Sequence, residues 1–111
     1  MRDLHWSATE KEVARRAFNA ALEREFALTI EKVKQRANSI QKPEDLWKLE
    51  RYLTRKRKEI DEKYDYRYSV LLNVFARLIC DGFLSEGELA GLGEDKMNHL
   101  RAWVMFSESR R

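Results

Sequence analysis

The chain has 111 residues, a formal net charge of +3, and 37% charged residues. No apolar run approaches the roughly 20 residues that span a bilayer, and the first residues lack the charged-then-apolar order of a secretory signal. Cys80 is the single cysteine, which excludes an internal disulfide and fits a reducing compartment. We therefore expect one small cytoplasmic domain without a membrane segment.

A long amphipathic helix is predicted from about Ala8 to Ile40. Ser7 and Glu10 have the spacing of a capping box, and neither proline nor glycine follows before Pro43. Apolar residues recur at spacings of three or four: Phe18, Leu22, Phe26, Ile30, Val33, Ala37 and Ile40. About 30 helical residues make a rod of roughly 45–50 Å, which is longer than a globule of this size. The rest of the chain covers only part of its stripe, so we expect a second copy to cover the remainder in a homodimer.

A second helix, with two different faces, is predicted from Pro43 to about Arg67, antiparallel to the first because the connection is short. An apolar seam is formed by Leu46, Leu49, Leu53 and Ile60. A second strip beside it holds Trp47, Arg51, Thr54 and Lys58, with Glu50 and Arg57 at the edge between the two. A tryptophan among arginines is typical of a surface that binds another protein. Trp47 fits either packing within the stalk or an anchor facing a partner, and both hold in a dimer.

Ion pairs at a spacing of four support this helix: Arg55 with Glu59, Arg57 with Asp61, and Lys58 with Glu62. A third, buried helix follows from Val70 to Ile79 and should end at Gly82. Ser85 and Glu88 form another capping box that predicts a short helix, and a last helix should begin near Glu94. The predicted fold is therefore all-α and homodimeric, with a long antiparallel two-helix stalk (about 8–67) and a small helical head (about 69–106).

Several chemical sites are considered and set aside. The segment DGFLSEGEL copies half of a calcium-binding loop, but Arg77 and Ile79 stand where the first oxygen ligands would be needed. His5 and His99 have no ligand partner at metal-site spacing, and Cys80 is interpreted as a core residue, as are Phe18, Phe26, Phe75 and Trp103. No activated nucleophile or phosphate loop is present. We expect neither an enzyme nor a cofactor.

The basic run Arg55–Lys58 gives the strongest suggestion of nucleic-acid binding. On a helix, four consecutive side chains point all round the axis, and Glu59, Asp61 and Glu62 follow at once. We therefore expect these residues to form a solvated face or an interface rim and not a nucleic-acid contact.

Longer strings resemble the fluorescence recovery protein family of cyanobacteria. They are DLWKL, the pair Lys56-Arg57, EID-x-KYD-x-R-x-SV from Glu59 to Val70, and VFA-x-L, and the likeness runs from about Glu44 to Leu100. The resemblance implies an all-helical homodimer without a cofactor. It also implies binding to the C-terminal domain of photoactivated orange carotenoid protein, whose return to the orange form these proteins accelerate.

The functional residues of this family carry over in part. Trp47 and Arg57 match its tryptophan and arginine, whereas Glu50 and Arg51 stand in place of a histidine and an aspartate. The aspartate pairs with the arginine in the family, so Arg51 reverses that charge unless Glu50 takes over the role. The chain is therefore interpreted as a divergent member with an altered grip on that partner, or as a regulator or scaffold of a different protein.

The sequence and the resemblance together predict two surfaces, one that binds a partner protein and one that forms the dimer. In the head, Asn73 and His99 stand where the resemblance places a phenylalanine and a lysine that touch the partner. The predicted partner-binding residues are Trp47, Glu50, Arg51, Arg57, Asn73 and His99. The predicted dimer interface comprises Phe26, Ile30, Val33, Trp47, Leu49, Arg51 and Leu53.

Overall fold

A computed structural model describes residues 5–109 of the chain. It contains the helices α1 (Ala8–Asn38), α2 (Pro43–Lys63), α3 (Leu71–Asp81) and α4 (Glu94–Ser109), with a short 3₁₀ helix η1 (Glu86–Leu89) before α4. No strand occurs among these residues; one isolated bridge joins Ala90 to Leu92. The predicted all-α fold is confirmed.

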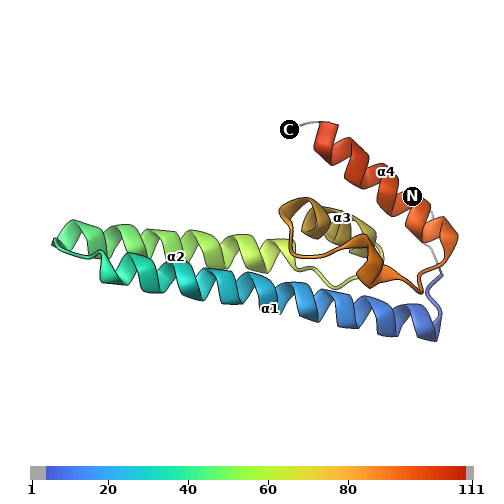
Figure 1. Cartoon of the computed structure of the whole chain (residues 1–111), viewed down its shortest axis with the longest axis horizontal. Coiled ribbons are helices and arrows are strands. Elements are labelled where there is room, and N and C mark those ends of the chain that lie inside the picture. Colours follow the sequence, from blue (N-terminus) through green and yellow to red (C-terminus); the bar gives the residue numbers. More distant parts are fainter. Residues whose placement is uncertain (1–4, 110–111) are drawn as a thin grey trace.

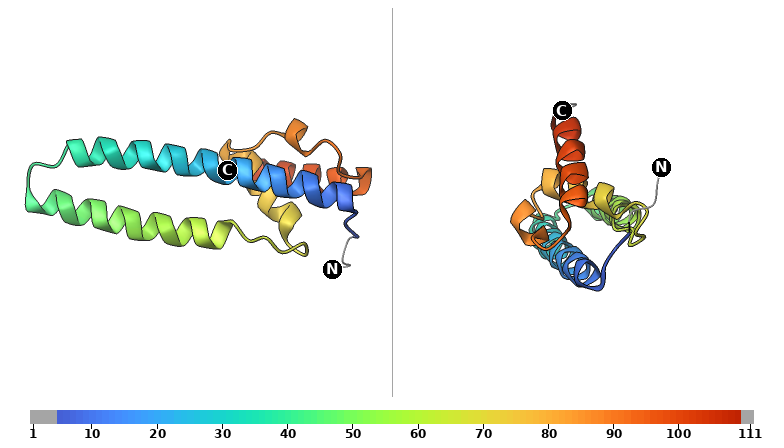
Figure 2. Two further views of the ribbon diagram at one scale, coloured as in Figure 1. Left: turned by 90° about the horizontal axis from the view of Figure 1, so that it is seen from below. Right: turned by 90° about the vertical axis from the view of Figure 1, so that its right-hand side faces the viewer.

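The first two helices form a long antiparallel hairpin (Figures 1 and 2). α1 begins at the predicted capping box, in which Ser7 and Glu10 exchange hydrogen bonds of 2.9 and 3.1 Å between side chain and backbone. Pro43 occupies the first turn of α2, as predicted, and Asp45 accepts the backbone N–H groups of Gln41 and Lys42 that the turn leaves free. The hairpin accounts for the elongated shape of 54 × 29 × 22 Å.

The hydrophobic core lies at the end of the hairpin away from its turn, where α3 and η1 lie beside the first half of α1 and α4 packs on α3 (Figure 1). Its largest fully buried apolar side chains are Leu71, Phe75, Leu78, Leu89 and Leu100. Gly82 ends α3 in a left-handed conformation with φ of 87°, which confirms the predicted helix stop. The turn half of the hairpin has no comparable core.

One predicted helix boundary is wrong. α2 ends at Lys63 rather than near Arg67, because the tyrosines that follow are drawn onto α1: the Tyr64 and Tyr66 rings stack edge-on against Phe18 at 5.4 and 4.9 Å. These tertiary contacts outweigh the helical pattern of the sequence. At Ser85 the predicted capping box and short helix are both present, and the helix is the 3₁₀ helix η1.

None of the helices in the described part of the chain has the length and apolar character to cross a membrane.

Candidate functional site

An apolar groove runs between α1 and α2 in the turn half of the hairpin. It has a volume of about 530 Å³, and its apolar walls are Phe26, Ile30, Val33, Leu53 and Ile60; we call these five residues the groove. Phe26 and Ile30 leave 46% and 54% of their surface exposed. Phe26 is therefore not part of the core of a single chain, since the neighbouring helix covers only one side of the α1 stripe, and its place in a dimer interface stays a prediction.

The exposure of the groove depends on which side of α2 packs against α1. Tyr52, Ile60 and Lys63 are its buried residues, and they point toward α1. Leu53 and Leu46 lie to the side of that direction and are half exposed, and Leu49 is half-buried. Of the four seam residues, only Ile60 is therefore buried inside the hairpin, and the other three lie along its side.

A second surface lies on the side of α2 that faces away from α1. Trp47, Arg51, Thr54 and Lys58 share one face at spacings of four, three and four, and all four are exposed; we call them the outer stripe. The Trp47 ring is 59% exposed. In the single chain, Trp47 therefore leaves most of its surface to solvent.

The two residues at the edge of the stripe are not paired with each other. The Thr54 hydroxyl donates to Glu50 at 2.8 Å, whereas Arg57 approaches Asp61 at 4.0 Å. Within residues 5–109, Glu50 makes no ion pair with Arg57, so it does not take the place of the missing aspartate inside one chain.

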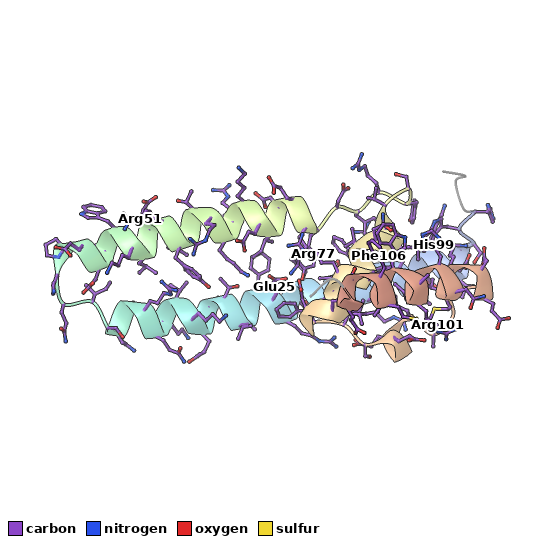
Figure 3. The ribbon with its side chains drawn as sticks, turned by 90° about the horizontal axis from the view of Figure 1, so that it is seen from above. Glu25, Arg51, Arg77, His99, Arg101 and Phe106 are labelled. Atoms are coloured by element: carbon purple, nitrogen blue, oxygen red, sulfur yellow. The ribbon has the colours of Figure 1, made fainter. Side chains whose placement is uncertain are left out.

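The two predicted partner residues of the head lie far from the outer stripe. Figure 3 shows Arg51 near the turn of the hairpin and His99 on α4 near the other end. His99 accepts a hydrogen bond of 2.8 Å from the Trp103 indole N–H, and Asn73 is half-buried on α3. One chain therefore brings together Trp47, Glu50, Arg51 and Arg57, but leaves Asn73 and His99 apart from them.

A buried carboxylate that the sequence did not single out holds the base of the hairpin. Glu25 on α1 is 2% exposed and receives Lys63 at 2.6 Å, Lys56 at 3.0 Å and the Tyr64 hydroxyl at 2.8 Å. Lys63 continues to Asp81 of α3 at 2.9 Å. Burial raises the pKa of Glu25, but the hydrogen bonds from Lys63, Lys56 and Tyr64 outweigh it, and the pKa is lowered from its ordinary value.

A signal for Glu25 was present in the sequence. It stands four residues after Ala21 and four before Thr29, and all three are buried on one face of α1. A charged residue in register with a buried face needs partners, which the local pattern does not identify.

A second buried pair joins the start of α1 to α4. Lys96 is 2% exposed and lies 3.1 Å from Glu10, and it also donates to the backbone oxygen of His5. Glu10 accepts the N–H groups of Ser7 and Gly93 at 2.9 and 2.7 Å. Burial opposes ionisation, yet these donors and Lys96 lower the pKa of Glu10 to about 2.

The carboxylates of the calcium-like segment are occupied by cations. Asp81 binds Lys63, and Glu88 receives both terminal nitrogens of Arg24 at 2.8 and 2.7 Å. No group of three or more His, Cys, Asp or Glu residues in the described part of the chain is arranged to hold a metal ion. Cys80 was predicted to be a core residue, and it is half-buried on α3.

Comparisons with known proteins identify the family to which the chain belongs. The model of a family described as "Photoprotection regulator fluorescence recovery protein" matches residues 6–104, which places the chain among regulators of photoprotection. The fluorescence recovery protein of Synechocystis sp. PCC 6803 is 40% identical over 97 residues, covering 87% of this chain and 89% of that protein. The chain belongs to the fluorescence recovery protein family.

Solved structures agree in fold. The fluorescence recovery protein of Fremyella diplosiphon superposes with a TM-score of 0.86 at 47% identity, over 89% of this chain and 97% of that one. The Synechocystis structure superposes with a TM-score of 0.87 at 39% identity, over 91% and 99% of the two chains. The family match therefore extends over the hairpin and the α3–α4 end together.

Proposed function

We propose that the chain is a regulator that binds photoactivated orange carotenoid protein and accelerates its return to the orange form, in the cytoplasm of a cyanobacterium. The observation that carries this proposal is Trp47, a tryptophan that leaves most of its surface exposed on the hairpin of a chain that belongs to this family. Such a ring loses apolar exposure only when a partner covers it.

The proposed action requires no bond chemistry. A protein that binds the relaxing arrangement of its partner more tightly than the photoactivated one shifts the population and lowers the barrier between them. A rigid surface favours this action, because little free energy is then spent on ordering the binding side chains. The Glu25 cluster, which ties both helices of the hairpin to α3, supports such rigidity.

We propose that a second copy covers the groove. Three of its five apolar walls, Phe26, Ile30 and Leu53, are about half exposed, and the single chain leaves them uncovered on that side of the hairpin. Lys34, Lys56, Arg57 and Asp61 surround those walls, so the edge carries both charge signs and suits a self-complementary contact. In this proposal the dimer holds the two α2 helices in a fixed relation.

A regulator of a different protein is a second candidate. It is favoured by Arg51, an unpaired cation where the family resemblance implies an acidic residue, and by Glu50, which is engaged with Thr54 instead of Arg57. On this account the fold is kept and the partner has changed.

Complex formation distinguishes the candidates. The protein is mixed with orange carotenoid protein in the dark and under blue light and passed over a size-exclusion column, with Trp47→Ala as the test variant. Met105→Ala is the matched control, because Met105 is also an exposed apolar residue, at 71% against 59% for Trp47, but lies on α4. We expect a light-enhanced complex that Trp47→Ala weakens and Met105→Ala does not. No complex under either condition would reject the carotenoid-protein partner.

A further inference from the structure

The basic residues of α2 are not equivalent in the folded chain. Residues 51–58 contain five basic side chains and no acidic one. Three of the five face a carboxylate: Lys56 lies 3.0 Å from Glu25, Arg55 lies 4.0 Å from Glu59, and Arg57 lies 4.0 Å from Asp61. Arg51 and Lys58 have no acidic group within 4.0 Å in residues 5–109. The predicted pair between Lys58 and Glu62 is therefore absent.

These two unpaired cations both belong to the outer stripe. Seven residues separate them, which is about two helical turns or roughly 10 Å along the axis. Trp47 lies one turn before Arg51 on the same face, and Thr54 between the cations is already engaged with Glu50. The stripe thus presents one apolar ring and two free charges in line.

The ends of the stripe carry the opposite charge. Glu44 stands three residues before Trp47 and Glu62 four residues after Lys58, so both lie near the same face of α2, and both are exposed. The cationic segment is therefore short and closed at each end by a carboxylate. The phosphates of a nucleic-acid strand that ran along this face would be repelled by both carboxylates. A typical DNA-binding protein makes roughly 6–10 phosphate contacts, whereas the stripe offers only two cations.

We infer that the outer stripe docks a discrete acidic patch on a protein partner, in which two carboxylates about 10 Å apart pair with Arg51 and Lys58 beside an apolar hollow that takes Trp47. This inference rests on the proposed function in that it gives the chemistry of the surface that the regulator recognises. Tryptophan and arginine are the residues that most often dominate binding at such surfaces. The charges steer and orient the encounter, and the ring provides the apolar contact.

A nuclear magnetic resonance titration tests the surface without any carotenoid protein. The labelled chain is titrated with a hexaglutamate peptide and, separately, with a hexathymidine oligonucleotide. We expect the peptide to shift the Trp47 indole and the amides of residues 51 and 58 most strongly, and Arg51→Glu to reduce those shifts at least about threefold. Arg16→Glu is the matched control, since Arg16 is exposed on α1 without an ion-pair partner among the described residues. Shifts spread over all exposed cations, equal effects of the two variants, or stronger binding of the oligonucleotide would overturn the inference.

Binding kinetics give the second measurement if the wild type binds photoconverted orange carotenoid protein. We expect Arg51→Glu to slow association about tenfold or more at low salt and Arg16→Glu to leave it within about twofold. Equal rates for the two variants would overturn the inference while leaving the proposed function intact. Failure of the wild type to bind would reject the proposed function, and the peptide titration would still decide the chemistry of the stripe.

Discussion

Replacing Glu25 with glutamine tests the cluster that holds the base of the hairpin. The substitution keeps the size of the side chain but removes the charge that faces Lys63 and Lys56. Lys63 is 7% exposed and would keep only Asp81 as a charged partner in the described part of the chain. Removing one member of a buried ion pair typically costs about 3–5 kcal/mol, because the other charge stays buried and unpaired.

We expect a loss at the lower end of that range, about 3 kcal/mol, because Lys56 is partly exposed and recovers some hydration. Glu59→Gln is the matched control: Glu59 lies 4.0 Å from Arg55 and from Lys56 but is half exposed, so its loss should cost less than about 1 kcal/mol. Urea unfolding of both variants at one fixed protein concentration gives the two free energies.

The pH dependence of the same experiment checks the cause. Because the pKa of Glu25 is lowered in the folded chain, its contribution is fully present above the unfolded pKa near about 4.3 and is lost as the pH falls through the folded value. The difference between wild type and Glu25→Gln should therefore shrink below about pH 4. Equal free energies for Glu25→Gln and Glu59→Gln at pH 7 would refute the reasoning.

Three further outcomes are expected. Gly91→Ala should destabilise the fold by about 2 kcal/mol or more in urea unfolding, because φ is +112° and the added Cβ would lie 2.9 Å from Val13. Gly82→Ala should cost only about 1 kcal/mol, because φ is +87° but the space around the added Cβ is open, and equal losses for the two variants would contradict the steric argument. The carboxyl resonance of Glu10 should titrate near pH 2, since its hydrogen bonds outweigh the effect of burial, and a midpoint above 4 would show that the pair is open in solution. Ile30→Glu should halve the mass seen in sedimentation while helix content is kept, and an unchanged mass would remove the groove from the dimer interface.

The sequence predicted those parts of the fold that depend on local chemistry. The capping box at Ser7, the proline at the start of α2 and the glycine that ends α3 each act within a few residues, and all three are confirmed. The end of α2 was wrong because it depends on a distant partner. Tyr64 and Tyr66 leave the helix to pack on Phe18, which lies far away in the sequence.

The candidate site was predicted to a similar extent. Spacing alone placed Trp47, Arg51 and Lys58 on one strip of the helix but left open whether Trp47 packs within the stalk, and the structure shows that all three are exposed. Spacing could not tell which side of the α1 stripe the second helix would cover, so Phe26 was assigned to the core and Glu25 was overlooked. Which cations remain free likewise depends on Glu25, a contact between residues 31 positions apart.

Action of the outer stripe on photoactivated orange carotenoid protein is measured by the rate of red-to-orange recovery in the dark. Photoconverted orange carotenoid protein is followed by absorbance with and without the protein, with Trp47→Ala and Met105→Ala alongside. The account predicts faster recovery with the wild type and Met105→Ala, and little acceleration with Trp47→Ala. An unchanged rate in a large molar excess of the wild type would contradict it.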